Sequence, residues 1–426
     1  MKGVKGFIPW KEGELGIVAL MAVNVFILLS TYYLLKVVRE PLILVGGGAE
    51  VKSYASAGQA VLLLAVVPGF GLLASKVNRI RLLVSMQTLF AGCLIAFYFL
   101  AKADVPIGVA FYLWLGIFSV LVVSNFWSFA TDLFTQEQGK RLFGLIGIGA
   151  SVGAVAGAVL PELIHSYVGT YELMLIAAGG LALSALLYVT TDRLDIRHHP
   201  EHEHKRRPTH ADEAIGKEGG FQLVLTDRYL RYVAAMIVIG TVVNSNGEYI
   251  IGKLVSAAGD HAPNKGDYIE QFYSQYYTIV NFAGLAIQGL VVTKVMGVVG
   301  VRRALFIMPL IVLGSWTTFL AAAMLQVLRV TKTAENSIDY SLNNTLKQAL
   351  FLPTTREVKY KAKAAIDTFF VRSADVVSAG FVFVFVQTLG GGLHVMAAIN
   401  IGLTIGWLVL ARNTGKQFDE LTAKPA

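Results

Sequence analysis

The stretch LQVLRVTKTAENSIDYSLNNTLKQALFLP, residues 325–353, has apolar side chains at helical spacing and lies between apolar segments of membrane length. This pattern predicts a membrane-spanning helix. The same stretch carries five charged side chains, and a charge at the bilayer centre costs at least about 2.5–3.5 kcal/mol, so these groups cannot face lipid. We therefore expect this span to line a solute pathway that the other spans enclose. The charged residues are Arg329, Lys332, Glu335, Asp339 and Lys347.

The composition of the whole chain supports a membrane protein. Of 426 residues, 55% are hydrophobic and only 15% are charged, and the mean hydropathy is +0.60. Soluble domains carry about 25% charged residues. Apolar runs recur along the sequence, each long enough to cross roughly 30 Å of hydrocarbon. The sequence therefore predicts an all-α polytopic membrane protein.

We expect twelve transmembrane helices. Apolar runs that are separated by charged or turn-forming residues define them. The predicted spans lie near residues 14–40, 54–75, 80–101, 106–131, 142–164, 171–191, 230–252, 268–292, 302–324, 325–350, 367–390 and 393–411.

The distribution of basic residues predicts the orientation of these spans. Most of the 36 lysines and arginines fall in alternate loops and at both termini, which the positive-inside rule places in the cytoplasm. The net charge of +8 is thus explained by cytoplasmic loops, and we expect no nucleic-acid partner. The first residues contain no short apolar region with a cleavage site, so no removable signal peptide is predicted. We expect a multi-pass protein of the inner (plasma) membrane.

A polar region splits the predicted spans into two sets of six. Residues 192–220 contain the run HHPEHEHKRRPTH, whose histidines have no regular metal-ligand spacing. A solvated cytoplasmic linker explains this region better than a metal site. The domain prediction is an N-terminal bundle at 1–191, the linker at 192–220 and a C-terminal bundle at 221–426.

The two halves repeat one motif. GLLASKVNRIRLL follows the second predicted span and GLVVTKVMGVVGVRRAL follows the eighth, each with a glycine, a lysine and then two arginines. This repeat resembles the loop signature of the major facilitator superfamily, with Ser75 and Thr293 in place of its acidic residue. The resemblance implies two six-helix bundles that are related by an axis along the membrane normal, with the substrate site between them near the midplane.

Charged residues in the first and seventh predicted spans and at the end of the fourth each have more than one interpretation. Lys36, Arg39 and Glu40 share one helix face, either extending to the outer interface or forming a cationic patch for an anionic solute. Asp132 is either a cavity carboxylate or part of the cytoplasmic turn. Glu248 lies inside an apolar run, either as a structural carboxylate or as a proton carrier or gating partner.

The fifth predicted span contains a glycine stripe. Gly149, Gly153 and Gly157 recur every four residues and therefore lie on one helix face. Close packing of a neighbouring helix is the main interpretation, and direct contact with a solute is the alternative.

Four segments resemble the ATP:ADP antiporter family, the nucleotide transporters of plastids and intracellular bacteria. They are YYLLKVVRE at 32–40, FWSFATDLF at 126–134, GEYIIGKL at 247–254 and DYSLNNTLKQALFLPTTREVKYKAKAAID at 339–367. The last is the most specific, and Lys347 falls on a lysine of the family pattern. The chain departs from that pattern at Asp339, Asn344, Thr345 and Gln348, and its first-span basic pair is exchanged, with Lys36 preceding Arg39.

The resemblance and the intramembrane charges together predict the binding residues. A nucleotide needs several cations in a low-dielectric site, and paired acids that compensate those cations when the site is empty. We expect no cofactor, no bound metal, a monomeric protein in contact with membrane lipids, and a small anionic substrate. The predicted substrate-binding residues are Lys36, Arg39, Asp132, Glu248, Asn343, Asn344 and Lys347. The predicted gating or coupling residues are Glu40, Arg329, Lys332, Glu335 and Asp339.

Catalytic motifs are missing from the sequence. It contains no GxxxxGK[ST] loop and no HExxH pair, so we expect neither an ATPase motor nor an intramembrane enzyme. The prediction is a secondary transporter of a nucleotide or related phosphorylated anion, working by alternating access as an exchanger or with protons. The alternatives are a proton-coupled transporter of a different anionic solute and a membrane-embedded binding module that transports nothing.

Overall fold

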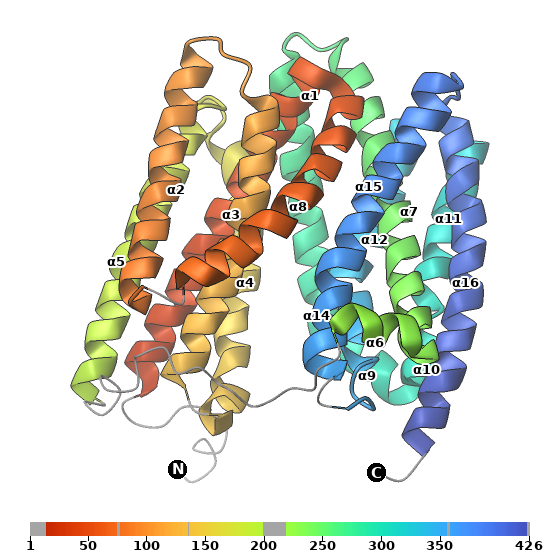
Figure 1. Cartoon of the computed structure of the whole chain (residues 1–426). Helices are drawn as coiled ribbons and strands as arrows, with labels where there is room; N and C mark the ends of the chain where they lie inside the picture. The colour runs from red at the N-terminus through yellow and green to blue at the C-terminus, as the bar shows by residue number, and fades with distance from the viewer. Residues whose placement is uncertain (1–13, 75–76, 135, 199–218, 356–357, 424–426) are drawn as a thin grey trace, which may run out of the picture. The chain divides into compact units, whose positions relative to one another are not determined.

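The protein is an all-α polytopic membrane protein. The computed structural model describes residues 14–74, 77–134, 136–198, 219–355 and 358–423, and these ranges contain helices and no strand (Figure 1). Among the described residues, nine helices are long and apolar enough to cross a membrane. The number is ten if the pair α8 and α9, bent by 44°, forms one span. The predicted fold class is confirmed.

The count of twelve spans is not reproduced directly, for two physical reasons. Helix α1 (Glu14–Ala74) joins the first two predicted spans into one element of 61 residues that is kinked at Gly48, whereas one crossing needs about 20 residues. The connection predicted at 41–53 is helical except at Gly48, whose φ of 71° is a backbone conformation that glycine adopts readily. The charged tenth predicted span, in turn, is too polar to qualify by hydropathy.

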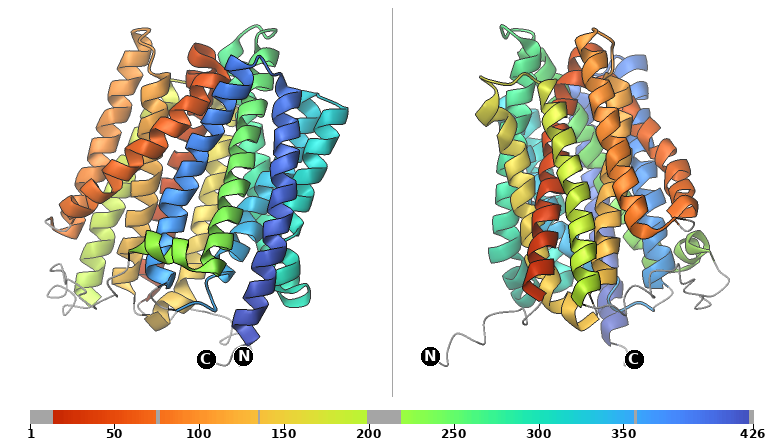
Figure 2. Two further views of the ribbon diagram at one scale, coloured as in Figure 1. Left: turned by 45° about the vertical axis from the view of Figure 1, so that its right-hand side comes forward. Right: turned by 90° about the vertical axis from the view of Figure 1, so that its left-hand side faces the viewer.

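The chain divides into two compact units by internal contacts. The first unit comprises Met1–Leu42, Ala65–Ala211 and Gly266–Thr278. Within it α2 and α5 pack along each other, and buried side chains of α1 to α5 form one apolar core (Figures 1 and 2). Besides its parts of α1 and α8, its helices are α2 (Arg79–Lys102), α3 (Gly108–Leu133), α4 (Gln136–Ile164) and α5 (Glu172–His198).

The second unit comprises Ile43–Leu64, Asp212–Lys265 and Ile279–Ala426. Within it α7 packs against α15 and α16, and α16 also contacts α11 (Figure 2). Its α-helices are α6 (Gly220–Thr226), α7 (Arg228–Gly259), the rest of α8 (Lys265–Leu290), α9 (Val292–Val298), α10 (Gly300–Ala304), α11 (Ile307–Ala321), α12 (Leu325–Ile338), α13 (Asn344–Ala349), α14 (Lys363–Ala365), α15 (Val371–Phe381) and α16 (Leu393–Ala423). Its π-helical segments are η2 (Asp339–Asn343), η3 (Val358–Ala362), η4 (Ile366–Phe370) and η5 (Val382–Thr388).

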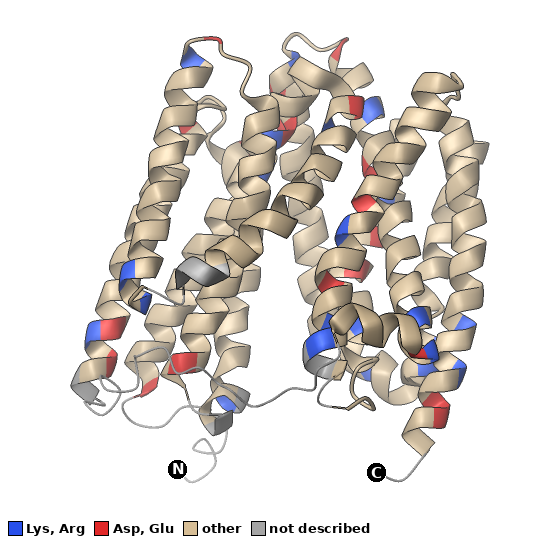
Figure 3. Ribbon diagram, in the orientation of Figure 1, with Lys and Arg blue, Asp and Glu red and all other residues tan. Residues whose placement is uncertain are grey.

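Most of each long helix is uncharged (Figure 3). Charged residues gather at helix ends and at a few points within helices, as expected for segments that cross hydrocarbon. Several predicted features lie outside the described residues: the N-terminal lysines, Lys76 of the first repeated motif, the His-rich linker at 199–218, and Arg356.

The glycine stripe of α4 packs against the backbone of α1 within the first unit. A Cβ atom on Gly149, Gly153 or Gly157 would overlap the backbone carbonyl groups of Ala22, Phe26 and Ser30. Ser30 Oγ also donates a hydrogen bond to the Gly153 carbonyl oxygen at 3.0 Å. The packing interpretation is therefore confirmed, and these glycines permit a close helix crossing.

This crossing yields a prediction on stability. Gly157→Ala forces the α1 and α4 backbones apart, and such overpacking costs about 1–3 kcal/mol. The matched control is Gly147→Ala on the same helix, where a Cβ meets no atom within 4 Å. Thermal unfolding in detergent is expected to show a lower midpoint for Gly157→Ala only. Equal midpoints for the two variants would refute the packing role.

Candidate substrate-binding site

The tenth predicted span is a broken helix that centres on a π-helical turn. Helix α12 runs into η2 at Asp339, and α13 continues from Asn344. A π turn holds one more residue than an α turn and re-aims the side chains around it, which is why such turns occur often at functional sites. Here the turn carries Asp339 and Asn343, two of the residues that the sequence singled out.

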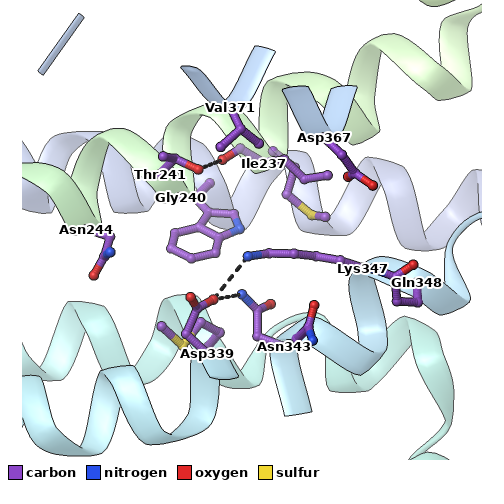
Figure 4. A pocket seen from close by; sticks show the side chains of 14 residues that line it. Ile237, Gly240, Thr241, Asn244, Asp339, Asn343, Lys347, Gln348, Asp367 and Val371 are labelled. Atoms are coloured by element: carbon purple, nitrogen blue, oxygen red, sulfur yellow. Dashed lines mark hydrogen bonds and ion pairs between the residues drawn. The ribbon is translucent and has the colours of Figure 1, made fainter. Parts of the chain in front are cut away.

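Lys347 reaches back to Asp339 across this turn. Lys347 Nζ lies 3.1 Å from Asp339 Oδ1, and Asn343 Nδ2 donates to the same oxygen at 2.6 Å (Figure 4). Long side chains on helices point toward the N-terminus, which explains how a lysine reaches an aspartate eight residues earlier. Both side chains are partly accessible, at 29% for Lys347 and 23% for Asp339. A ligand can therefore reach this ion pair.

The ion pair lines a cavity within the second unit. The cavity has a volume of about 340 Å³, and Lys347 extends along it toward Asp339 (Figure 4). Pockets that bind small molecules are typically about 300–1,000 Å³ in volume. The residues that line it are Met236, Ile237, Gly240, Thr241 and Asn244 of α7, Met308 of α11, Asp339 and Asn343 of η2, Asn344, Lys347 and Gln348 of α13, Asp367 of η4, Val371 of α15 and Trp407 of α16.

A second ion pair lies deeper in the same unit. Lys332 Nζ is 3.0 Å from Glu335 Oε2, and the two side chains are 0% and 2% exposed. The same Nζ donates to Asn244 Oδ1 at 2.8 Å, which links this buried pair to a residue of the cavity wall. A buried lysine without compensation would be strongly destabilising, so the pair explains how Lys332 is tolerated.

The remaining charges predicted in this unit take other roles. Glu248 accepts a hydrogen bond from Asn336 Nδ2 at 3.1 Å, although the sequence predicts a cationic partner for it. Arg329, one turn before Lys332 on α12, is not among the residues that line the cavity. Arg372 and Asp375 pair locally at 3.6 Å, as their spacing predicts.

The first unit holds the other predicted cations. Lys36 Nζ lies over the rings of Tyr277 and Tyr33, 4.1 and 5.3 Å from their centroids. Arg39 Nε donates to Glu40 Oε1 at 3.1 Å, and the fully buried Glu40 also accepts from Tyr277 Oη at 3.3 Å. Cations over aromatic faces gain electrostatic stabilisation, and here these side chains form a compact cationic and aromatic patch within the first unit.

Asp132 lies at the end of α3 within the first unit. Its side chain is 67% exposed and forms an ion pair with Arg79 at the start of α2. The guanidinium of Arg79 also lies over the Phe129 ring at 5.2 Å. This placement agrees with the turn alternative for Asp132.

Sequence reasoning missed several walls of the cavity. Trp407 lies in the uncharged last predicted span, and Met236 and Met308 lie in apolar segments, so they read as ordinary packing residues. Asp367 and Gln348 stand inside the segment that resembles a known family, but their chemistry alone did not distinguish them. No periodic signal marks an apolar residue that faces a cavity rather than another helix.

Comparison with known proteins places this geometry in a family. Residues 15–334 match the family model of the Major Facilitator Superfamily. The chain belongs to this superfamily. Residues 320–418, which include both ion pairs and the whole segment singled out by its charges, match the model of the TLC ATP/ADP transporter. The resemblance to the ATP:ADP antiporter family is thereby confirmed.

Relatives of known name support the same assignment. The chain is 22% identical to ADP,ATP carrier protein 2, chloroplastic, of Arabidopsis thaliana, over 72% of this chain and 54% of the relative. It is 22% identical to ADP,ATP carrier protein 1 of Chlamydia pneumoniae, over 70% of this chain and 65% of the relative. The chain thus spans about half of the length of the plant relative.

Solved structures of transporters share the fold. A bacterial homolog of the human lysosomal transporter Spinster aligns with a TM-score of 0.64 at 11% identity, covering 98% of this chain and all of that one. The nucleoside transporter NupG aligns with a TM-score of 0.66 at 11% identity, covering 96% of this chain and all of the other. At such identity the likeness concerns the fold alone.

The buried pair yields a prediction on stability. Lys332→Met leaves the Glu335 carboxylate buried without compensation, and breaking such a pair costs about 3–5 kcal/mol. The double variant Lys332→Met/Glu335→Gln removes both charges and is expected to regain at least half of that loss. Unfolding in mixed micelles measures the stability of the single and the double variant.

The control for this prediction is an exposed pair. Lys102 forms an ion pair with Glu172 at the surface of the first unit. The two charged groups lie 2.6 Å apart, and the side chains are 47% and 34% exposed. Such pairs contribute about 0–1 kcal/mol, so Lys102→Met is expected to change stability little. A double variant at 332 and 335 that is as unstable as Lys332→Met alone would contradict the assigned pairing.

Proposed function

We propose that the protein is a secondary transporter that moves a nucleotide of the ATP/ADP type, or a related phosphorylated anion, by alternating access. The two moving halves are 1–191 and 221–426, joined by the linker at 192–220. The observation that carries the proposal is the accessible Lys347–Asp339 pair. It lines a cavity inside the part of the chain that matches the TLC ATP/ADP transporter model.

The chemistry of a phosphate anion fits this pair. In the empty site Asp339 compensates Lys347, so no charge is left alone in a low-dielectric environment. An arriving phosphate replaces the Asp339 carboxylate as the anionic partner of the Lys347 ammonium group, because phosphate is the stronger partner. Binding is thereby coupled to the release of Asp339, a change at the helix break that favours one conformation over another.

Within the first unit, the cationic patch is a further place where an anionic group can bind. Lys36 lies over the aromatic faces of Tyr33 and Tyr277. Arg39, with its planar guanidinium, is suited to bidentate phosphate contacts. In this proposal Asp132 and Glu248 act at a distance from the phosphates, and Lys332 with Glu335 stabilises the break in the helix.

The proposal includes a cellular setting. The positive-inside pattern supports an inner-membrane protein with both termini in the cytoplasm, surrounded by lipid and active as a monomer. An ADP,ATP carrier of a bacterium, Chlamydia pneumoniae, is among its relatives.

Transport of labelled nucleotide into proteoliposomes tests the function. The unchanged protein is expected to take up ATP or ADP, faster when the vesicles contain a counter-substrate. Lys347→Ala removes a charge-assisted contact to phosphate and is expected to reduce uptake about tenfold or more. The matched control is Lys265→Ala, which removes a surface lysine that pairs with Asp260 at 2.7 Å. If no nucleotide is transported under any of these conditions, the proposed function fails.

Coupling to protons is a second candidate, favoured by one observation. Glu335 Oε1 is buried and has no hydrogen-bond partner among the described residues, which leaves an oxygen that can accept a proton. Glu248, hydrogen-bonded to an amide, is the other carboxylate that can exchange protons here.

A proton-coupled transporter is expected to show uptake that rises with an inward proton gradient. Glu248→Gln, which cannot ionise, is expected to abolish that dependence while nucleotide exchange persists. Uptake that ignores the gradient in the unchanged protein would exclude proton coupling and leave exchange as the mode.

A further inference from the structure

The cavity of the second unit has two chemically different walls. One wall is polar and comes from the broken helix, with Asp339, Asn343 and Lys347 side by side (Figure 4). The other is apolar and comes from α7, α11 and α16, where Met236, Met308 and Trp407 lie. Gly240 makes room for the indole of Trp407, because a Cβ there would lie 3.0 Å from the ring. A flat apolar group with hydrogen-bonding edges fits between such walls.

The charge of the lining does not suit a chain of phosphates. Among the described residues, the cavity is lined by two carboxylates and one ammonium group. The carboxylates belong to Asp339 and Asp367, and the ammonium group belongs to Lys347. Lys347 is already compensated by Asp339, and Asp367 is bound by Lys363 at 2.5 Å. The lining is therefore neutral to acidic, and it repels a polyphosphate while it accepts one phosphate at most beside Lys347.

The acceptors on the polar wall are oriented toward ligand donors. Among the residues that the structure describes, the contacts of Asp339 from Asn343 and Lys347 both end on Oδ1. Its second oxygen, Oδ2, therefore keeps its lone pairs for an N–H or O–H group of a ligand. Amino groups of a base and hydroxyl groups of a ribose are such donors.

On the opposite side of the cavity, the amide group of Asn244 is held in one orientation by a residue outside the cavity. Asn244 Oδ1 accepts a hydrogen bond from Lys332, so its amide orientation is set and its NH₂ group remains for the cavity. Lys332 is itself held by Glu335 and is fully buried, so it does not rearrange easily. Lys332 thus acts as a positioning residue for Asn244, and Asn244 donates to acceptor atoms of a base or ribose.

We propose that this cavity binds the nucleoside part of the transported nucleotide. Asp339 and Asn244 read the base or ribose, Trp407 and the two methionines cover its face, and Lys347 touches at most the phosphate next to the ribose. The remaining phosphates are held by cations outside this cavity. The inference rests on the proposed function and adds to it which end of the substrate the second unit recognises.

Binding measurements with three probes test this inference on the full chain in detergent. Adenosine, ATP and inorganic triphosphate are titrated by calorimetry, and the emission of Trp407 is followed by comparison with Trp407→Phe. Adenosine is expected to bind, to displace ATP and to quench Trp407. Inorganic triphosphate is expected to bind about tenfold more weakly than ATP or worse and to leave Trp407 emission unchanged.

The substitution Asp339→Asn separates a nucleoside site from a phosphate site, because it is expected to change the affinities for adenosine and triphosphate differently. For a nucleoside site, the Kd of adenosine is expected to rise about tenfold, because an acceptor that binds a ligand donor is lost. The Kd of triphosphate is expected to stay the same or fall, because a repelling charge is gone. A folding defect would weaken both probes together, so their opposite response is not a structural effect.

A second variant and a control complete the test. Asn244→Ala is expected to raise the Kd values of adenosine and ATP about tenfold, as Asp339→Asn does for adenosine. The Kd of triphosphate is expected to rise by less than about twofold. The control Gln288→Ala removes an exposed amide of α8, 3.5 Å from Thr345 Oγ1, and is expected to change none of the three. An unchanged adenosine affinity in Asp339→Asn, or an ATP affinity that rises together with that of triphosphate, would overturn the inference.

The outcomes also separate this inference from the proposed function. If ATP is bound and transported but adenosine does not bind, the nucleoside site is refuted and nucleotide transport stands. If neither ATP nor ADP is bound or transported by the unchanged protein, the proposed function is refuted and the inference falls with it.

Discussion

A charge inside a membrane span must have a partner, and the second unit is built around this constraint. Lys332 has essentially no exposed surface, yet Glu335 and Asn244 both contact its ammonium group. Lys347 is compensated in the same way by Asp339. Since an uncompensated charge at such depth costs several kcal/mol, these pairs fix which helix faces turn inward. The apolar helices α7, α11 and α16 then cover the polar face and close the cavity.

The two ion pairs differ in a way that suggests different tasks. The Lys332–Glu335 pair is inaccessible, and it holds Asn244 in one orientation. The Lys347–Asp339 pair is partly exposed, and it lies where the helix passes through a π turn. A rigid inner pair beside an exchangeable outer pair is what a carrier needs, because one preserves the fold while the other responds to the substrate.

The sequence predicted the helical class and the charged span because both depend on strong local signals. Apolar length, basic loops and intramembrane charge are all visible in a single chain. The pairing of Asp339 with Lys347 also followed from the need for compensation. The hydrogen bond between Glu248 and Asn336 of α12 was not foreseen, since an asparagine amide satisfies a carboxylate as readily as a lysine does.

Other features had no local signal. The π turns preserve the apolar pattern of an α-helix, so periodicity could not locate η2 or η4. Residues 41–53 stood between two predicted spans, but only Gly48 departs from helical geometry there. Trp407, Met236 and Met308 are apolar residues in apolar helices, and only the three-dimensional packing shows that they face a cavity.

Photolabelling with 8-azido-ATP tests the central claim most directly, because it asks where the base of a nucleotide lies. Irradiation of the full protein, followed by mass spectrometry of its peptides, identifies the labelled residues. The account predicts label on the cavity walls of the second unit, in α7, η2, α13 or α16, and protection by excess ADP. Label that lies elsewhere, or that ADP does not prevent, would contradict it.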